Sequence, residues 1–449
     1  MRTTDKARYG HLLRILGLAF GLAVVVGGVI GQGILRTPGI VAGAVPDPTL
    51  IILLWTLGGV MILIDACAWV ELGASIPRAG GPYALARRAF GQVGGNVIGW
   101  ADWINNILVL SFISVVFGEY CHRVGIGTQW PVGIVALVLI AACAAINWTG
   151  TRISGASQTL LSALKGAAMV ILVLALFLAG DGVQEPSAIG PGASSTLSWA
   201  AFLLAVSAIL NTYAGWTGSF YFGEEIVEPE RNMARSTFGG ILLVMALYLA
   251  VNAALLHVLS PAAMATSELP AADAASQVFG PMGATVITVV SLISLGAIAN
   301  LYVMFISRIG FAMARDDVLP RALARTSLTG TPRVALSVGV IVAAAAALSG
   351  TYLELVAIVV PLTAALVAAI DLASIVMRRR EPDLPRPFKM PLYPLPALVG
   401  IVLNLALTAA LLVADPWHSA IGIVGAIILG AGYAIFGRRE EPSLAAPEV

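Results

Sequence analysis

Residues 24–35 read VVVGGVIGQGIL and lie in the middle of a hydrophobic segment, 14–42, that is long enough to cross a lipid bilayer. The stretch contains four glycines, and a glycine in a helix interior costs roughly 1 kcal/mol relative to alanine. The cluster therefore predicts a break in the helix, and unpaired backbone groups at membrane depth are tolerated only where they line a cavity. Amides at a helix start attract a carboxylate and carbonyls at a helix end attract an ammonium, so such a break suits a small zwitterion. The alternative is that the glycines allow close packing of helices.

The composition is that of a membrane protein. Hydrophobic residues make up 59% of the 449 residues and charged residues only 11%, against about 25% charged residues in soluble domains. The three cysteines have neither metal-site nor redox spacing, and we expect them to pack as small apolar side chains. The sequence contains no nucleotide-binding loop, no metal-ligand motif and no paired nucleophile and base. It therefore predicts no enzyme, no cofactor, no metal and no nucleic acid partner.

Apolar runs of the length that a bilayer demands, about twenty residues, recur about twelve times and predict an all-α polytopic fold. The predicted spans are 14–42, 50–77, 95–121, 131–149, 156–180, 198–226, 237–259, 281–312, 333–350, 352–377, 392–413 and 417–437. Basic residues gather in the tails 1–13 and 438–449 and in alternate loops, whereas the other loops hold Arg123 and otherwise acids. Because cytoplasmic loops carry the excess of lysine and arginine, we expect both termini to be cytoplasmic.

A second interrupted span predicts an internal symmetry. Residues 211–218 read NTYAGWTG and again place small and polar residues inside an apolar run, 198–226. Two interrupted spans at matching places in two halves are the best sequence indication of a transporter site. We therefore expect two five-helix repeats, 14–180 and 198–377, each with a discontinuous first helix, and two peripheral helices in 392–437. Because five is odd, the second repeat would be inverted in the membrane, and the packing explanation for the glycines would have to apply twice.

Several motifs resemble those of the amino acid–polyamine–organocation (APC) transporters. They are IGQGIL at 30–35 with Pro38 and Gly39 behind it, ELGASIPRAGGPY at 71–83, YAGW at 213–216 followed by Glu224, Glu225 and PERN at 229–232, and MARDDVLP at 313–320. The resemblance is closest to the L-type amino acid transporter and bacterial amino acid permease branches. It implies a secondary transporter of neutral amino acids in a bacterial inner membrane. Such a protein works by alternating access without sodium, as an exchanger or a proton-coupled symporter, so its partners are the amino acid, the bilayer and protons.

Two alternatives remain beside this interpretation. A permease for a cationic amino acid or a polyamine would need an acid at the side-chain end of the pocket, and no acid flanks either break. A nutrient sensor with a transporter fold would usually signal through an added cytoplasmic domain, and the predicted tails are short. Both alternatives are therefore less favoured than an amino acid transporter.

The two breaks and the resemblance together predict the substrate-binding residues. They are Val29, Gly31, Gln32, Gly33 and Ile34 in the first span and Asn211, Thr212, Ala214 and Gly215 in the sixth. Amides of the first set would face the substrate carboxylate, and carbonyls of the second set its ammonium. Gln32 departs from the family pattern, which has a small residue there, and it either contacts substrate or points into the interface with the sixth span. Asn211 stands where many relatives carry an aromatic gate, which Tyr213 or Trp216 could replace.

Lys165 lies in the middle of the fifth predicted span, where an ammonium is costly unless it has a partner. A lysine near a helix end can extend to the interface, but Lys165 lies about 15 Å from either end. By resemblance it takes the place of the sodium ion that sodium-coupled relatives use. There it would reach carbonyls near Val26 to Gly28 and hydroxyls such as Ser291 or Ser294 of the eighth span.

The remaining charged residues of the spans each allow more than one interpretation. A cluster at the inner end of the sixth span consists of Glu224, Glu225, Arg231 and Arg235. Its ion pairs would latch an inward gate or serve structure alone. Asp65, in the middle of the second span, would pair with a polar neighbour or handle protons. Arg36, in the outer half of the first span, could lie along the substrate path.

Overall fold

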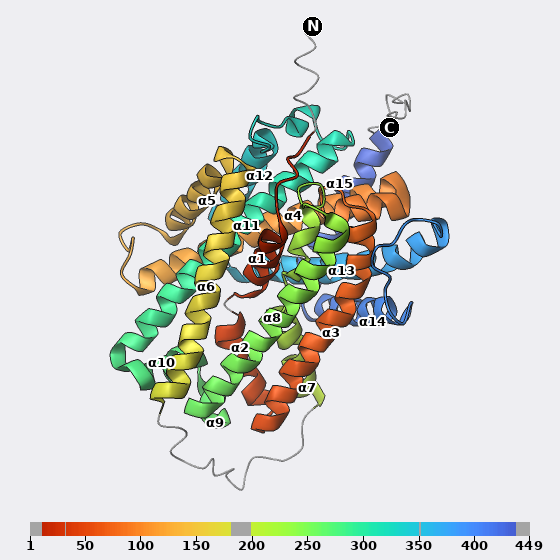
Figure 1. Cartoon of the computed structure of the whole chain (residues 1–449). Helices are drawn as coiled ribbons and strands as arrows, with labels where there is room; N and C mark the ends of the chain where they lie inside the picture. The colour runs from red at the N-terminus through yellow and green to blue at the C-terminus, as the bar shows by residue number, and fades with distance from the viewer. Residues whose placement is uncertain (1–10, 32, 181–198, 350–351, 437–449) are drawn as a thin grey trace.

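The computed structural model describes residues 11–31, 33–180, 199–349 and 352–436, and these ranges consist of helices joined by turns and loops (Figure 1). The elements in order are α1 (Leu18–Val29), α2 (Gly33–Ala44), α3 (Pro48–Ser75), α4 (Pro82–Arg123), α5 (Val132–Thr149), α6 (Thr151–Ala179), α7 (Trp199–Thr212), η2 (Trp216–Tyr221), α8 (Pro229–Val258), α9 (Pro261–Thr266), α10 (Pro270–Phe279), η3 (Gly280–Met282), α11 (Gly283–Arg315), η4 (Arg321–Ala324), α12 (Arg333–Ser349), α13 (Tyr352–Arg380), α14 (Leu395–Ala414) and α15 (Pro416–Phe436).

Each predicted span coincides with a helix or with a broken pair of helices, so the all-α polytopic fold is confirmed. Within the described ranges, nine helices are long and apolar enough to cross a bilayer, and α1 and α2, bent by 46°, pass the same test together as a pair. The other two predicted spans are α12, an apolar helix of 17 residues, and the broken pair α7 and η2. The chain is therefore a multi-pass membrane protein.

The structure also contains helical segments that the sequence analysis did not anticipate. α4 begins at Pro82, well before the predicted span 95–121, and Gly91 interrupts its regular geometry with a φ of +77°. Two short helices, α9 and α10, lie in the loop between α8 and α11. Each begins with a proline, whose missing N–H costs nothing at the first helical position. Helices of this length fall below the window over which hydrophobicity predicts a span.

Several helices at matching places in the two halves have similar lengths, and several pack against their counterparts. α3 and α8 have 28 and 30 residues, α5 and α12 have 18 and 17, and α6 and α13 have 29 each. α3 packs against α8 (Figure 1), α4 against α11 and α5 against α12, and η2 packs against α1. Equivalent elements of two repeats meet in this way when a pseudo-two-fold axis relates the repeats.

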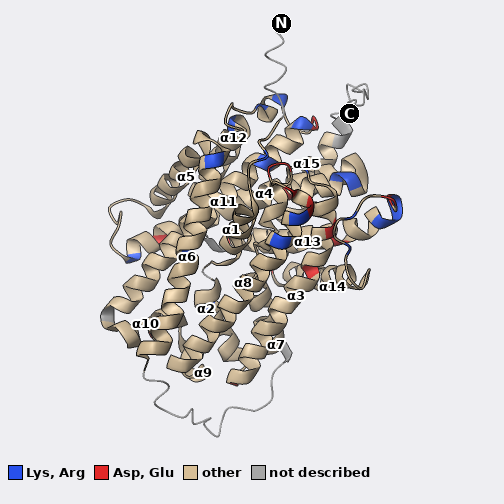
Figure 2. Ribbon diagram, viewed as in Figure 1, with Lys and Arg blue, Asp and Glu red and all other residues tan. Residues whose placement is uncertain are grey.

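The charged side chains are unevenly distributed along the molecule. Lysine and arginine gather towards the end at which α1 begins and α15 ends, while the half around α2, α7 and α9 is almost free of them (Figure 2). This asymmetry is the one that the basic loops of the sequence predict for the cytoplasmic face. The end that holds the start of α1 is called the inner end below, and the end around α9 the outer end.

Candidate substrate and coupling site

The first span is broken where its glycines lie. α1 ends at Val29, Ile30 has an extended backbone with ψ of 99°, and α2 begins at Gly33. The carbonyls of Val29 and Ile30 are thereby freed from the helix and accept hydrogen bonds from side chains of other helices. Gly33 and Ile34 begin α2, so their amides are among those that have no partner within the helix. Gln32, for which we predict a substrate contact, lies outside the described residues.

The sixth span is broken at the matching place. α7 ends at Thr212, and a turn through Tyr213 and Ala214 leads to Gly215, whose φ of +101° lies in the left-handed region that favours glycine. The 3₁₀ helix η2 then continues from Trp216. The predicted break therefore falls within residues 211–218, as the sequence indicates.

The two breaks touch each other. A side-chain carbon added at Gly28 would collide with the carbonyl oxygen of Gly215, and one added at Gly215 would collide with that of Gly28. A carbon at Gly33 would lie only 2.8 Å from Cγ2 of Thr212. The hydroxyls of Thr212 and Thr37 are 2.7 Å apart, so α2 and α7 are also linked by a hydrogen bond. Glycine is thus required here for the approach of two backbones as well as for the break itself.

Tyr248 of α8 joins the two breaks, and the sequence analysis missed it. Its buried hydroxyl lies 2.8 Å from the carbonyl oxygen of Val29 and 3.2 Å from that of Thr212. One phenol therefore donates towards the freed carbonyls of both broken helices. A tyrosine in an apolar span carries no local signal for this role, because both partners are distant in sequence.

Lys165 of α6 contacts the first break from behind. Its side chain is fully buried, and Nζ donates to the carbonyl oxygen of Gly27 and, at 2.7 Å, to that of Ile30. Ser294 of α11 donates to the same Ile30 oxygen at 2.9 Å. The hydroxyl of Ser291 instead donates to Ile287 of its own helix. Lys165 and Ser294 therefore lie together at the break, and Ser291 is one turn away.

A chain of polar side chains leads from Lys165 towards the inner end. Ser162 donates to the carbonyl oxygen of Ala23 at 2.8 Å and accepts from the amide of Gln158 at 3.2 Å. Asn300 donates to Gln158 at 2.9 Å, and Asn147 donates to Asn300 at 2.8 Å. Residues 158, 162 and 165 lie on one face of α6 at helical spacing, a polar stripe in an apolar helix that the sequence analysis overlooked.

The two aromatic residues considered for the outer gate pack against α3 in this structure. The ring of Tyr213 lies 6.0 Å from that of Trp55, and its hydroxyl donates to the Trp55 carbonyl oxygen at 3.3 Å. The ring of Trp216 lies 5.5 Å from that of Trp69. Both gate candidates are buried, whereas the side chain of Asn211 is exposed.

Two ion pairs close the inner end of the sixth span, but their partners differ from those predicted. Arg308 of α11 donates to Glu225 through Nε at 3.0 Å and through Nη2 at 2.9 Å, and both side chains are fully buried. Glu224 pairs with Arg315, with 2.6 Å between Oε1 and Nη2.

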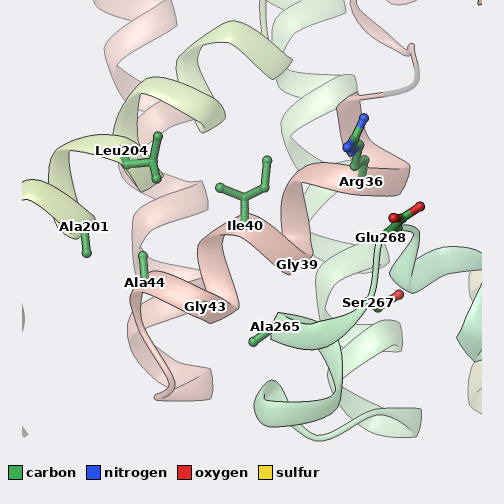
Figure 3. A pocket seen from close by; sticks show the side chains of 10 residues that line it. All are labelled: Arg36, Gly39, Ile40, Gly43, Ala44, Ala201, Leu204, Ala265, Ser267 and Glu268. Atoms are coloured by element: carbon green, nitrogen blue, oxygen red, sulfur yellow. The ribbon is translucent and has the colours of Figure 1, made fainter. Parts of the chain in front are cut away.

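The arginines that the sequence analysis grouped with these acids lie elsewhere. Arg231 and Arg235 are exposed on α8, and the described part of the chain gives them no ion pair. Asp65 lies beside Asp371 of α13, next to Gly400 of α14. Arg36 lines a cleft of about 420 Å³ at the outer end, formed by α2, α7, α9 and the loop after α9 (Figure 3). Glu268 belongs to the same cleft, next to Ser267.

The comparison with known protein families matches residues 16–433, nearly the whole described chain, to a family described as amino acid permease. The chain belongs to the amino acid permease family. This confirms the resemblance to the APC transporters that the motifs indicated. Members of this family are membrane transporters, so the protein is a transporter and no enzyme.

Curated relatives of this permease cover nearly its whole length. The serine/threonine exchanger SteT of Bacillus subtilis is 28% identical over 432 residues, which are 94% of this chain and 96% of that protein. The b(0,+)-type amino acid transporter 1 of the mouse is 27% identical over 415 residues, 90% of this chain and 84% of that protein. The Asc-type amino acid transporter 1 of the mouse is 28% identical over 439 residues, 95% of this chain and 81% of that protein.

Proposed function

We propose that this permease is a secondary active transporter of neutral amino acids that works by alternating access without sodium. The observation that carries the proposal is the contact between the two helix breaks at Gly28 and Gly215, because it brings a helix start and a helix end together at membrane depth. The printed names of the relatives, among them a serine/threonine exchanger, support amino acids as the substrate class. Exchange and proton symport are both compatible with the site.

The proposed substrate site is made largely of backbone groups. Its members are Val29, Gly31, Gln32, Gly33, Ile34, Asn211, Thr212, Ala214 and Gly215. The amides at the start of α2 would bind the carboxylate, since they have no partner within the helix and lie at the positive end of its dipole. The carbonyls at the end of α7 would bind the ammonium. Such a site recognises the part that all amino acids share and leaves the side chain to neighbouring helices.

The proposed architecture is two inverted repeats, residues 14–180 and 198–377, with helices 392–437 at the periphery. The packing of α3 on α8, α4 on α11 and α5 on α12 supports it, since each helix meets its counterpart. The concentration of lysine and arginine at the inner end supports a cytoplasmic location for both tails, 1–13 and 438–449. We place the protein in the cell membrane on this basis.

In the proposed cycle, Lys165 takes the place of a coupling cation. Its charged ammonium holds the Gly27 and Ile30 carbonyls and so ties the inner half of the first span, α1, to α6. Ser294 adds a tie to α11 through the same Ile30 oxygen. Loss of the proton would weaken these bonds and release α1, and the charged form would repel sodium from the same place. The ion pairs of Glu224 and Glu225 would hold the inner gate closed until then.

The test is uptake into proteoliposomes that contain the full chain. A panel of labelled neutral, acidic and cationic amino acids and polyamines is offered with and without a proton gradient, sodium and an internal counter-substrate. We expect saturable uptake of neutral amino acids that is independent of sodium and is stimulated by the proton gradient or by the counter-substrate. Uptake that requires sodium, or that favours polyamines or lysine over every neutral amino acid, would refute the proposal.

A further inference from the structure

Asp65 of α3 and Asp371 of α13 face each other inside the membrane. A side-chain carbon added at Gly400 of α14 would collide both with Oδ1 of Asp65 and with Oδ2 of Asp371, so the two carboxyl groups are neighbours beside this glycine. Asp371 is fully buried, and neither of its oxygens has a hydrogen-bond donor among the described residues. Oδ1 of Asp65 also has none. The glycine thus leaves a small space into which the two carboxyl groups of the neighbouring helices point.

Among the described residues, no cation of the surrounding helices neutralises this pair. α14 and α7 contain no charged residue, and Asp102 of α4 bonds instead to Tyr221 and Asn106. His418 of α15 pairs with Asp415, and Arg235 of α8 is exposed near the inner end of that helix.

The nearest ionisable groups along α3 and α13 are either uncharged or already ion-paired with other residues. Cys67, a neutral thiol, follows Asp65 by two residues on α3. Glu71 is held by Arg378 of α13 and by Arg386, at 2.5 and 3.4 Å. This cluster lies about 9 Å closer to the inner end than the aspartates, by the helical rise. Two carboxylates that face each other without a cation repel, and both cannot ionise there at low cost.

We propose that Asp65 and Asp371 form a proton-binding pair that is loaded and unloaded from the inner side. The bound proton forms an O–H bond to one carboxylate and is donated in a hydrogen bond to the other, so the pair carries one negative charge in place of two. Release reverses this step and returns the proton to water. The chemical class of the ligand is a proton rather than a metal, because the described residues contain no third acid, histidine or cysteine that could complete a metal site with this pair.

The location of the pair favours access from the inner end. Asp65 lies ten residues before the end of α3 at Ser75, and Asp371 nine residues before the end of α13 at Arg380, so each is about 15 Å or less from the inner end of its helix. The outer end of α3 is 17 residues away, or about 25 Å. Asp65 is partly exposed, whereas Asp371 is fully buried.

The pair also joins two parts of the molecule. α3 packs mainly against α8, which in turn packs against α1, whereas α13 packs mainly against α4 and α14. A shared proton attracts α3 to α13, and its loss leaves two negative charges that push the helices apart. Protonation of this pair therefore changes the contact between α3, which belongs with α8 and α1, and α13, which belongs with α4 and α14. Its effect on transport rests on the proposed function above, whereas proton binding does not.

Infrared spectroscopy of the purified full chain tests proton binding without a substrate. We expect a carboxylic acid C=O band that shifts in D₂O and disappears as the pH is raised from about 5 to about 9, because two facing carboxylates keep one proton to a higher pH than a lone carboxylate does. Asp371→Asn and Asp65→Asn should each abolish the pH-dependent band. Asp102→Asn, which removes another buried carboxyl group, and Lys165→Ala should leave it. An acid band that persists unchanged across this range would overturn the proposal, because the proton would then be a permanent structural one. A band that both aspartate variants retain would also overturn it, because the band would then not come from this pair.

Proteoliposomes then test the link to transport. The initial uptake rate should change by up to about tenfold per unit of internal pH while one proton titrates, and by less than about twofold in Asp371→Asn. Asp65→Asn serves as the second variant, because an amide in either place can donate to the remaining carboxylate and preserve the contact. If the wild-type protein shows the infrared titration but both variants transport like the wild type, the pair binds a proton that is not coupled to transport. That result would leave the proposed transport function itself intact. A band that is displaced by sodium would identify a metal cation as the ligand and refute the proton.

Discussion

Replacement of Glu225 by glutamine should release the inner end of the sixth span. The glutamine has the same shape as glutamate, but it leaves the guanidinium of Arg308 buried without a counter-charge. Both side chains are fully buried, and the guanidinium carbon lies 5.3 Å from the centre of the Phe222 ring, so water does not replace the lost charge. Removing one partner of such a pair costs about 3–5 kcal/mol. At 1.4 kcal/mol per factor of ten, the closed inner end should become at least roughly a hundredfold less populated relative to an open one.

Hydrogen–deuterium exchange in lipid nanodiscs measures this change locally. The amide of Leu16 donates to the Glu225 carbonyl oxygen at 2.9 Å, and the amide of Val227 donates to the Leu16 carbonyl oxygen at 2.8 Å. These bonds tie the segment before α1 to the loop after η2, so their exchange reports opening of the inner end. Protection of both amides should fall by the same factor of roughly a hundred in Glu225→Gln, while peptides from α9 and α10 at the outer end keep theirs.

Glu224→Gln is the matched control, since Glu224 and its partner Arg315 are about one-fifth exposed. An ion pair with access to water contributes roughly 0.2–1 kcal/mol, so protection should fall by less than about sixfold. Equal losses in the two variants would refute the argument from burial. If amide protection falls as much in α9 and α10 as in the inner loop, the protein unfolds globally. The ion pair of Glu225 with Arg308 would then have no separate role in closing the inner end.

Three further predictions concern the site itself. Gly33→Val should weaken substrate binding by at least about tenfold, because a carbon there meets Thr212 at 2.8 Å, and amino acid esters should not compete; strong competition by a decarboxylated amine would contradict recognition of the carboxylate. Asn211→Phe should slow exchange and select smaller substrates, and identical transport by Asn211→Phe and Asn211→Ala would remove this residue from the gate. Lys165→Ala should bind substrate in an equilibrium assay but lose most net transport, with residual uptake insensitive to pH; an unchanged rate and pH profile would exclude the lysine from the mechanism.

The features that the sequence predicts well are those with a local energetic cost. Glycines in an apolar span destabilise a helix wherever the helix packs, and both breaks occur where glycines and polar residues interrupt the runs 14–42 and 198–226. A lysine in the middle of a span must find partners, and Lys165 lies against the carbonyls of the first break.

The features that the sequence did not predict depend on partners far apart in the chain. Arg308 is 83 residues from Glu225, and a local sequence pattern indicates only arginines that are near in the chain, such as Arg231 and Arg235. Asp371 was not considered at all, although Asp65 was, because each acid is ordinary in sequence until the fold brings the two together. Tyr248 escaped notice for the same reason. These partners can be identified only once the packing of α3, α8, α11 and α13 is known.

The contact of Lys165 with its carbonyls and the ion pair of Glu225 with Arg308 need different conditions before they can break. This difference predicts which of the two breaks first in the conformational change. Lys165 is bound by neutral carbonyls, so loss of one proton leaves no charge behind and the contact can break in a dry site. Separation of Glu225 from Arg308 would leave an anion and a cation unpaired, a step that is affordable only when water reaches both. Release of α1 from Lys165 should therefore come first and admit water to the inner end, and the ion pair of Glu225 with Arg308 should separate only afterwards. The reverse order would place two bare charges in a low-dielectric interior, at a free energy far above that of a single deprotonation.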